Sequence, residues 1–172
     1  MNIPYAGVFV IDMTDWMVLA GTDSKYPEEL KALGGMMKPG DKSIRATAYR
    51  ELAEEGQTQV LESTLVFVEP YKGHLRHFFL ADKISSALDK GATWEVEERG
   101  ADGRVVEKIT ARWVPLSEFV HRLFPKQHPA FGAVLAKLSE RNPGLIRSER
   151  FRALLQRFPA PNNLGLQGAQ VD

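Results

Sequence analysis

The chain has 172 residues, of which 44% are hydrophobic and 26% are charged, and its formal net charge is +0. These values are typical of a single globular domain with a substantial core, so we expect a folded chain rather than a disordered one. A net charge of zero also provides no long-range field that would attract the chain to nucleic acid or to an anionic membrane.

The sequence contains no cysteine, which excludes disulfides, thiolate metal sites and cysteine nucleophiles. This composition is consistent with an intracellular protein, and we expect a cytoplasmic location. The N-terminal segment lacks a basic stretch before its apolar run, and no run of about 18 apolar residues follows. We therefore expect neither a signal peptide nor a membrane span.

The first predicted element is a β-hairpin. Residues 6–13 and 16–20 are apolar and rich in β-branched and aromatic side chains, and polar residues that favour a turn separate them. Residues 22–33 are mostly polar and contain Pro27, which predicts a loop with room for a single helical turn.

A helix is predicted after two turns. Residues 34–35 (Gly-Gly) and 39–41 (Pro-Gly-Asp) are strong turn signals. Ser43 then stands at the N-cap position before a good helical stretch, and Gly56 is suited to the C′ position behind it. We therefore expect a helix over about residues 44–55.

Strands dominate the middle of the chain. Segments there that are apolar, or that alternate between apolar and polar residues, indicate strands at residues 57–70, 75–81, 94–98, 104–108 and 111–114. The glycine-containing residues 72–73 and 100–103 predict the turns of two hairpins.

The last third of the chain predicts helices. Ser117 is expected to cap a helix over residues 118–124, and an apolar stripe at helical spacing predicts a second helix over residues 130–141. A third amphipathic helix is expected over residues 148–158. The polar residues 159–172 that follow are expected to be mobile or docked on a partner chain.

The order of these elements is hairpin, helix, strands and then helices. This order indicates an α+β or mixed α/β sandwich rather than a repeated βαβ fold. We expect one domain over residues 1–158, which includes the C-terminal helices, with residues 159–172 as a tail outside it.

The helix predicted at residues 44–55 carries an acidic stripe. At 100° per residue, Arg50, Glu51, Glu54 and Glu55 fall along one arc, and apolar residues cover much of the other side. Clustered carboxylates destabilise a helix unless a cation compensates, and Mg²⁺ prefers hard oxygen ligands of this kind. A solvated surface is the common alternative for such a stripe, but the capped helix and the two turns before it favour a metal site.

The segment from Gly34 to Glu55 resembles the Nudix box of the Nudix (MutT-like) hydrolase family. That pattern is Gly, five residues, Glu, seven residues, and then Arg-Glu-apolar-x-Glu-Glu-x-Gly-apolar. Gly35 matches its first glycine, and its core is matched by Arg50, Glu51, Leu52, Glu54 and Glu55. A weaker similarity at residues 113–116 extends the shared layout over most of residues 3–140.

The chain departs from this pattern in the loop before the helix, which carries one extra residue. Counting forward from Gly35, the glutamate position holds Asp41, whereas counting back from Arg50 it holds Lys42. We take Asp41 as the equivalent residue. After the helix, the glycine and the apolar residue of the pattern are replaced by Gln57 and Thr58.

The resemblance implies a Nudix-type α/β/α sandwich with a mixed β-sheet, and a hydrolase that depends on Mg²⁺ or Mn²⁺. The ion would neutralise phosphate charge, orient the diphosphate and activate a water that attacks phosphorus. The implied catalytic residues are Glu51, Glu54 and Arg50, the implied metal ligands are Glu51, Glu54, Glu55 and Asp41, and the implied substrate-binding residue is Gly35.

The substrate implied by the resemblance is a nucleoside diphosphate linked to another moiety, such as a nucleotide or a sugar nucleotide. The alternative is a catalytically impaired Nudix-fold module that binds nucleotides or has a regulatory role, because Asp41 and Lys42 alter the box. A third hypothesis is an α+β interaction domain with a solvated acidic stripe. No membrane or nucleic-acid partner is expected, but capped RNA as a substrate and a homodimer through the last helix both stay open.

Other polar and aromatic residues are expected to have ordinary structural roles. Glu107 is the weaker candidate for a further carboxylate in the site, whereas Glu95, Glu97 and Glu98 are expected to be surface charges of a hairpin. The arginines of the last helix are expected to form a solvated face, and the aromatic residues of the strands to lie in the core.

Overall fold

The computed structural model of the protein describes residues 2–162 and 171–172. The strands are β1 (Tyr5–Asp12), β2 (Met17–Asp23), β3 (Tyr26–Lys31), β4 (Leu33–Met36), β5 (Gln59–Tyr71), β6 (His74–Ser86), β7 (Thr93–Arg99) and β8 (Val105–Pro115). The α-helices are α1 (Ile44–Gly56), α2 (Leu116–Arg122), α3 (His128–Arg141) and α4 (Glu149–Arg157), and two 3₁₀ turns are η1 (Pro125–Gln127) and η2 (Pro143–Arg147).

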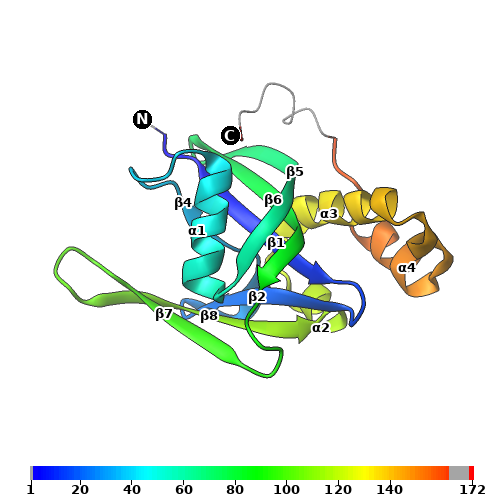
Figure 1. The fold of residues 1–172 in the computed structure, drawn as a ribbon, viewed down its shortest axis with the longest axis horizontal. Coiled ribbons are helices and arrows are strands. Elements are labelled where there is room, and N and C mark those ends of the chain that lie inside the picture. The colour runs from blue at the N-terminus through cyan, green and yellow to red at the C-terminus, as the bar shows by residue number, and fades with distance from the viewer. Residues whose placement is uncertain (1, 163–170) are drawn as a thin grey trace.

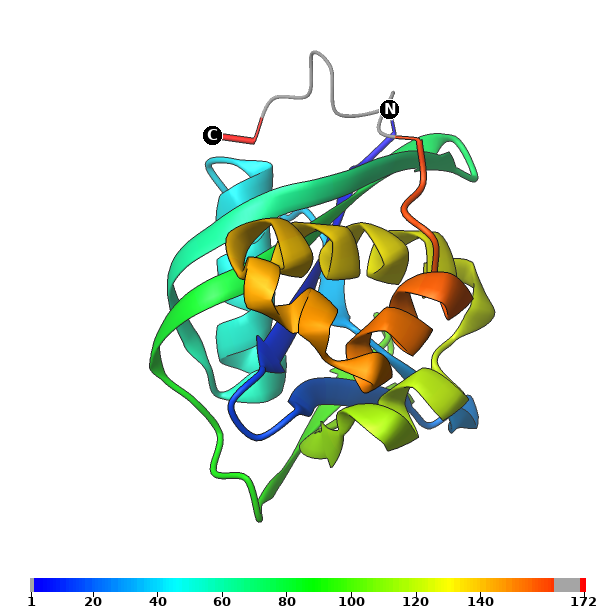
Figure 2. The same ribbon diagram turned by 90° about the vertical axis from the view of Figure 1, so that its right-hand side faces the viewer.

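The strands form one mixed sheet with the order β5-β6-β1-β2-β8-β7, in which β3 also pairs with β2 and β4 with β1. The β1–β6 pair is parallel, and the other pairs are antiparallel. Helix α1 covers one face of the sheet, and α2, α3 and α4 cover the other, as Figures 1 and 2 show from two sides. The expected α/β/α sandwich is therefore confirmed.

Each face of the sheet has its own hydrophobic core, because successive side chains of a strand point to opposite sides. Ala6 and Val8 of β1 pack in the core that includes Leu52 of α1. Phe9 of the same strand contacts Phe131 of α3 in the other core, with ring centroids 5.8 Å apart. Helix α1 is thus fixed to the sheet by its apolar side, which leaves its acidic stripe free to face a cavity.

The predicted hairpin at the N-terminus is confirmed, but the loop predicted over residues 22–33 is wrong. Strand β3 fills half of that segment and pairs with β2, and β4 follows it. Pro27 is tolerated because β3 lies off the main path of the sheet, where a missing N–H donor costs little. Tertiary pairing thus outweighs the polar composition of this segment.

The turn predicted at residues 34–35 is also wrong, since both glycines lie inside β4. Gly34 pairs with Gly7 and Gly35 pairs with Ala6 of β1. A Cβ atom at Gly34 would lie 2.7 Å from the Cα atom of Gly7, so the absence of a side chain permits close approach of two strands. The two glycines serve strand packing rather than chain reversal.

The predicted helix is confirmed as α1, with Ser43 as its N-cap. The Ser43 hydroxyl accepts a hydrogen bond of 2.9 Å from the N–H of Ala46. The assignment of Gly56 as the C′ residue is wrong, because Gln57 adopts the left-handed conformation with φ 46°. A Cβ atom at Gly56 would lie 2.7 Å from Cδ1 of Leu33, so packing against β4 explains this glycine.

The strands and helices predicted after α1 are present, with two changes. The segment at residues 111–114 is not a separate strand but the end of β8. Helix α2 begins at Leu116, and the expected cap by Ser117 is wrong because the helix follows Pro115 without a side-chain cap. Helices α3 and α4 are confirmed, and the Ser148 hydroxyl accepts from the N–H of Phe151 at the start of α4.

The β7–β8 hairpin is the edge of the sheet and extends beyond the body of the molecule (Figure 1). Its base is joined to α1 by a hydrogen bond of 2.9 Å from the indole Nε1 of Trp94 to the backbone oxygen of Glu54. One strand of this hairpin therefore lies beside the acidic stripe of the helix.

The predicted mobility or docking of residues 159–172 falls largely on residues 163–170, which lie outside the described part of the chain. The described residues 171–172 contact the start of α1. The backbone oxygen of Val171 accepts a hydrogen bond from the N–H of Arg45, and Nε of Arg45 donates a hydrogen bond of 2.7 Å to the Asp172 carboxylate. Within the described residues, no helix has the length and apolarity needed to cross a membrane.

Two serines that the sequence predicts as helix caps have different environments, which gives a test of the fold. Replacing Ser43→Ala removes an N-cap and should lower the free energy of unfolding by about 1 kcal/mol. Replacing Ser117→Ala removes no cap and should change it by less than about 0.5 kcal/mol. Urea titration of the two variants measures the difference, and equal losses of stability would contradict the assignment.

Candidate functional site

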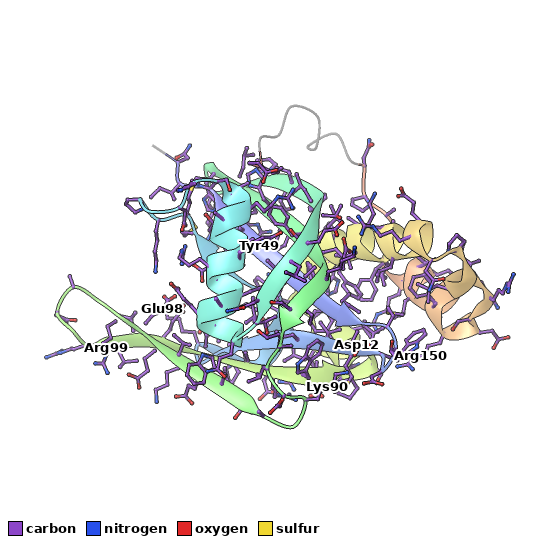
Figure 3. All side chains as sticks on the ribbon, viewed as in Figure 1. Asp12, Tyr49, Lys90, Glu98, Arg99 and Arg150 are labelled. Carbon is purple, nitrogen blue, oxygen red and sulfur yellow. The ribbon has the colours of Figure 1, made fainter. Side chains whose placement is uncertain are left out.

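A cavity of about 510 Å³ opens between α1, β4 and β7. Its lining residues are Gly35, Met36, Lys38, Glu51, Glu54, Glu55, Val96, Glu97, Glu98 and Arg99. The acidic stripe of α1 forms one wall, and β7 forms the opposite wall, where Figure 3 labels Glu98 and Arg99. All three glutamates that the sequence predicts as metal ligands on the helix therefore reach one space.

The Glu51 carboxylate lies against the backbone of β4. A Cβ atom at Gly35 would overlap that carboxylate, with its Cδ atom at 2.6 Å. Only a glycine leaves this volume empty, so Gly35 forms a cradle for a buried acidic group. Burial raises the pKa of Glu51, and the hydrogen bond from Arg50 opposes that rise.

Glu55 is buried beside Glu51, with 6% of its surface exposed. Its Oε1 accepts a hydrogen bond of 3.1 Å from the N–H of Gly34. Burial, followed by the negative charge of Glu51, raises the pKa of Glu55 to about 8. Two adjacent carboxylates that resist ionisation in this way form an environment that a divalent cation would stabilise.

Arg50 links the loop before α1 to the carboxylates on the helix. Its Nε and Nη2 donate to the two oxygens of Asp41, at 2.8 and 2.9 Å. Its Nη1 donates to Glu51 at 2.8 Å and to Glu54 at 3.1 Å. This guanidinium therefore neutralises part of the acidic cluster and fixes the position of Asp41.

Asp41 is fully hydrogen-bonded in this arrangement. In addition to the two bonds from Arg50, its Oδ2 accepts from the N–H of Lys38 and from the hydroxyl of Thr47, both at 2.9 Å. The hydrogen bond from Arg50 holds the pKa of Asp41 well below its usual range. The predicted role of Asp41 as a metal ligand would require its carboxylate to exchange some of these partners.

Within residues 2–162 and 171–172, no three acidic or histidine side chains are grouped so that they could hold a metal ion as they stand. The arrangement of Arg50 explains this, since its Nη1 lies between Glu51 and Glu54. Glu54 itself is about half exposed, with 48% of its side chain accessible, and lies 3.9 Å from the ammonium group of Lys38. The carboxylates share one cavity, and cationic side chains occupy the space between them.

Glu98 is a cavity residue that the sequence analysis assigned to the surface. It lies on β7, on the same face as Trp94 and Val96, because residues two apart in a strand share a face. Its negative charge raises the pKa of Glu55, which places it near the acidic stripe. The period-two pattern of β7 could have grouped these side chains, but nothing in the sequence indicates that α1 would lie beside them.

Glu107 is placed outside the cavity lining. It forms a carboxyl pair with Asp23, and burial together with that hydrogen bond raises its pKa. Its carboxylate lies 3.6 Å from the ammonium of Lys25. Glu107 pairs with Glu98 across the β7–β8 ladder, and the charge of Glu98 raises the pKa of both Glu107 and Glu55.

A sequence model of the NUDIX domain matches residues 1–137 of the chain. No curated protein sequence matches it. Among solved structures, the chain is similar to a MutT from a study of Aliivibrio salmonicida and Vibrio cholerae, with a TM-score of 0.58, 16% identity, and coverage of 80% of this chain and 99% of that one.

Two further solved structures are similar in fold. A MutT NUDIX hydrolase from Burkholderia pseudomallei has a TM-score of 0.51 at 17% identity and covers 73% of this chain and 92% of its own. A NUDIX hydrolase from Nitrosomonas europaea has a TM-score of 0.51 at 17% identity and covers 71% of this chain and 78% of its own. The TM-scores show a shared fold at these low sequence identities. The assignment to a family rests on the match to the NUDIX domain model.

The raised pKa of Glu55 predicts how the stability of the metal-free protein depends on pH. The folded state retains a proton that the unfolded state loses above its pKa of 4.5, so stability falls as the pH rises from there to about 8. Between pH 5 and 8.5, the free energy of unfolding of the wild type should fall by a few kcal/mol more than that of Glu55→Gln, on the order of 2–4 kcal/mol.

Urea unfolding in EDTA across this pH range measures the effect. Glu62→Gln is the matched control, because Glu62 is an exposed glutamate paired with Lys83. That variant should retain the pH dependence of the wild type. Identical pH profiles for the wild type and Glu55→Gln would show that Glu55 is ionised at neutral pH in the folded protein.

Proposed function

The chain belongs to the Nudix family of pyrophosphohydrolases, and from this we propose that it hydrolyses a nucleoside diphosphate linked to another moiety, using Mg²⁺. One observation carries the proposal. Glu51 and Glu55 are buried side by side against the glycines of β4, at the wall of a cavity of about 510 Å³. That volume lies within the range of cavities that bind small molecules, about 300–1,000 Å³.

The residues of the cavity fit a divalent cation. Glu51, Glu54 and Glu55 would hold it, since they offer hard oxygen donors, and Mn²⁺ would serve in place of Mg²⁺. The Nη1 group of Arg50 donates to two of these carboxylates and supplies a positive charge where the cation would bind. When bound, the ion supplies neutralisation of phosphate charge and activation of an attacking water.

The side chains of the protein would perform the remaining steps. The water adds to one phosphorus, the bond to the bridging oxygen breaks, and that oxygen leaves with the other phosphate group. We propose Glu54, the most exposed carboxylate of the stripe, as the group that accepts the proton of the water. Lys38, which also lines the cavity, is placed to contact the departing phosphate.

Arg50 and Asp41 would act as positioning residues in this scheme. The bidentate pair holds Arg50 at a fixed distance from Glu51 and Glu54. Because Asp41 already accepts four hydrogen bonds, a role in orienting Arg50 accounts for its contacts better than direct metal binding does. Gly35 contributes through the space that it leaves for Glu51.

The proposal is tested by incubating the protein with nucleoside triphosphates, sugar nucleotides, dinucleoside polyphosphates and capped RNA, with and without Mg²⁺. We expect turnover of at least one class that requires the metal. Glu54→Gln and Glu55→Gln should lower kcat/KM by about 100-fold or more, because each removes a charged ligand or base. Glu62→Gln, an exposed glutamate outside the cavity, should retain full activity.

Tight nucleotide binding without turnover of any substrate would contradict hydrolysis. That result would instead support the alternative of an impaired Nudix-fold module that binds nucleotides. The absence of both binding and turnover would leave the third hypothesis, an α+β interaction domain.

The extra residue in the box yields a second prediction. Replacing Asp41→Asn removes the charge that holds Arg50, so Arg50 can pair more closely with Glu51 and Glu54 and compete with the metal. The Mg²⁺ concentration for half-maximal activity should rise by about tenfold or more. Lys42→Gln, at an exposed position outside the cavity lining, should leave it within about twofold.

Activity measured against Mg²⁺ concentration separates these two residues. If Lys42→Gln raised the Mg²⁺ concentration for half-maximal activity more than Asp41→Asn did, Lys42 and not Asp41 would be the residue equivalent to the glutamate of the Nudix box.

A further inference from the structure

We infer that Arg99, at the end of β7, binds the phosphate chain of the substrate from the cavity wall opposite α1. The identity of the bound group as a phosphate chain rests on the proposed function. The placement of Arg99 rests on the residues that line the cavity, the charges of the cavity and the contacts of its guanidinium.

The β7–β8 ladder is irregular next to Arg99, and the cavity follows this end of β7. Glu98 pairs with Glu107 of β8, but Arg99 pairs with Val105, so Val106 is an extra residue on β8 and the ladder is irregular at this point. In a regular strand, adjacent side chains point to opposite faces, so a cavity on one face of β7 would be lined by every second residue. Val96, Glu97, Glu98 and Arg99 all line it, so the cavity extends around the end of β7 and Arg99 borders it.

The charges of the cavity favour a phosphate contact by Arg99. Five glutamates line the cavity, and they repel a phosphate chain unless cations face its oxygens. A metal held by α1 would cover the oxygens on the helix side. On the β7 side, Arg99 is the cation among the described lining residues, and Lys38 stands across from it at the edge of the helix wall.

The contacts of Arg99 hold its guanidinium while leaving donors available. Its Nη1 donates to the backbone oxygen of Gly103 at 2.8 Å, and its Nη2 donates to Glu97 at 2.7 Å. A guanidinium has five N–H donors in a planar fork that matches two phosphate oxygens, so donors remain for a ligand. The side chain is 57% exposed, which leaves those donors accessible from the cavity.

Arg104 provides a matched control on the same hairpin. It is also an arginine, it is 87% exposed, and it pairs with Asp102 in the turn. It does not belong to the cavity lining. Replacing either residue removes one positive charge from the hairpin, so a difference between the two variants reports the local contact rather than the net charge.

The test compares Arg99→Ala, Arg99→Lys and Arg104→Ala in the full chain with Mg²⁺. Binding is measured by calorimetry with imidodiphosphate and with α,β-imido-ATP, in which nitrogen replaces the scissile bridging oxygen. Arg99→Ala should bind both probes about tenfold more weakly than the wild type, as expected for loss of a charge-assisted hydrogen bond. Arg99→Lys should recover part of the loss because it keeps the charge but not the fork. Arg104→Ala should match the wild type.

Steady-state kinetics on the hydrolysed substrate give the second readout. Arg99→Ala should raise KM by about tenfold and change kcat by less than about twofold, because the contact exists in the ground state as well as in the transition state. Equal binding by Arg99→Ala and Arg104→Ala would overturn the inference, and so would a wild type that binds neither probe. A wild type that binds the probes through Arg99 but hydrolyses nothing would retain this inference and remove the proposed hydrolysis.

Discussion

The burial of two carboxylates against a glycine strand is the constraint on which the rest of the site depends. The Glu51 carboxylate occupies space that a side chain at Gly35 would fill, and Glu55 accepts a hydrogen bond from the N–H of Gly34. This arrangement requires β4 to pair with β1 and α1 to pack closely on the same face of the sheet. Burying the carboxylates is unfavourable, and the packing of α1 on the sheet offsets that free energy.

The ion pair between Arg50 and Asp41 joins the loop before α1 to the acidic stripe, although this loop has one residue more than the Nudix pattern. The loop turns at Asp41, whose N–H donates to the oxygen of Lys38, and its beginning is held by the bond from Met37 to Pro4. The carboxylate of Asp41 then reaches the guanidinium with both oxygens. A shorter acidic side chain in a longer loop thus reaches the arginine that the helix presents, so the spacing in the sequence and the spacing in space need not agree.

The parts of the structure that the sequence predicts are those that depend on local chemistry. The N-cap at Ser43, the helix that it starts and the hairpin turns follow from a few neighbouring residues, and all are present. The strand at residues 33–36 could not be predicted, because Gly34 and Gly35 are turn residues by composition and become strand residues only through pairing with β1. Gln57 in a left-handed conformation is a similar case, in which the packing of Gly56 on Leu33 moves the helix end by one residue.

The acidic stripe was predictable from the sequence, whereas the opposite wall of the cavity was not, and the reason is physical. Four residues of the stripe share one helix, so their geometry follows from the helical period alone. Glu98 and Arg99 reach the cavity because β7 lies beside α1, to which the indole of Trp94 is hydrogen-bonded. The helix wall is fixed by buried packing, but the hairpin wall is an edge of the sheet, where changes in length and sequence disturb little else. The residues that would bind metal and those that would select the substrate are therefore held by different parts of the fold, so the hairpin can change without displacing the carboxylates.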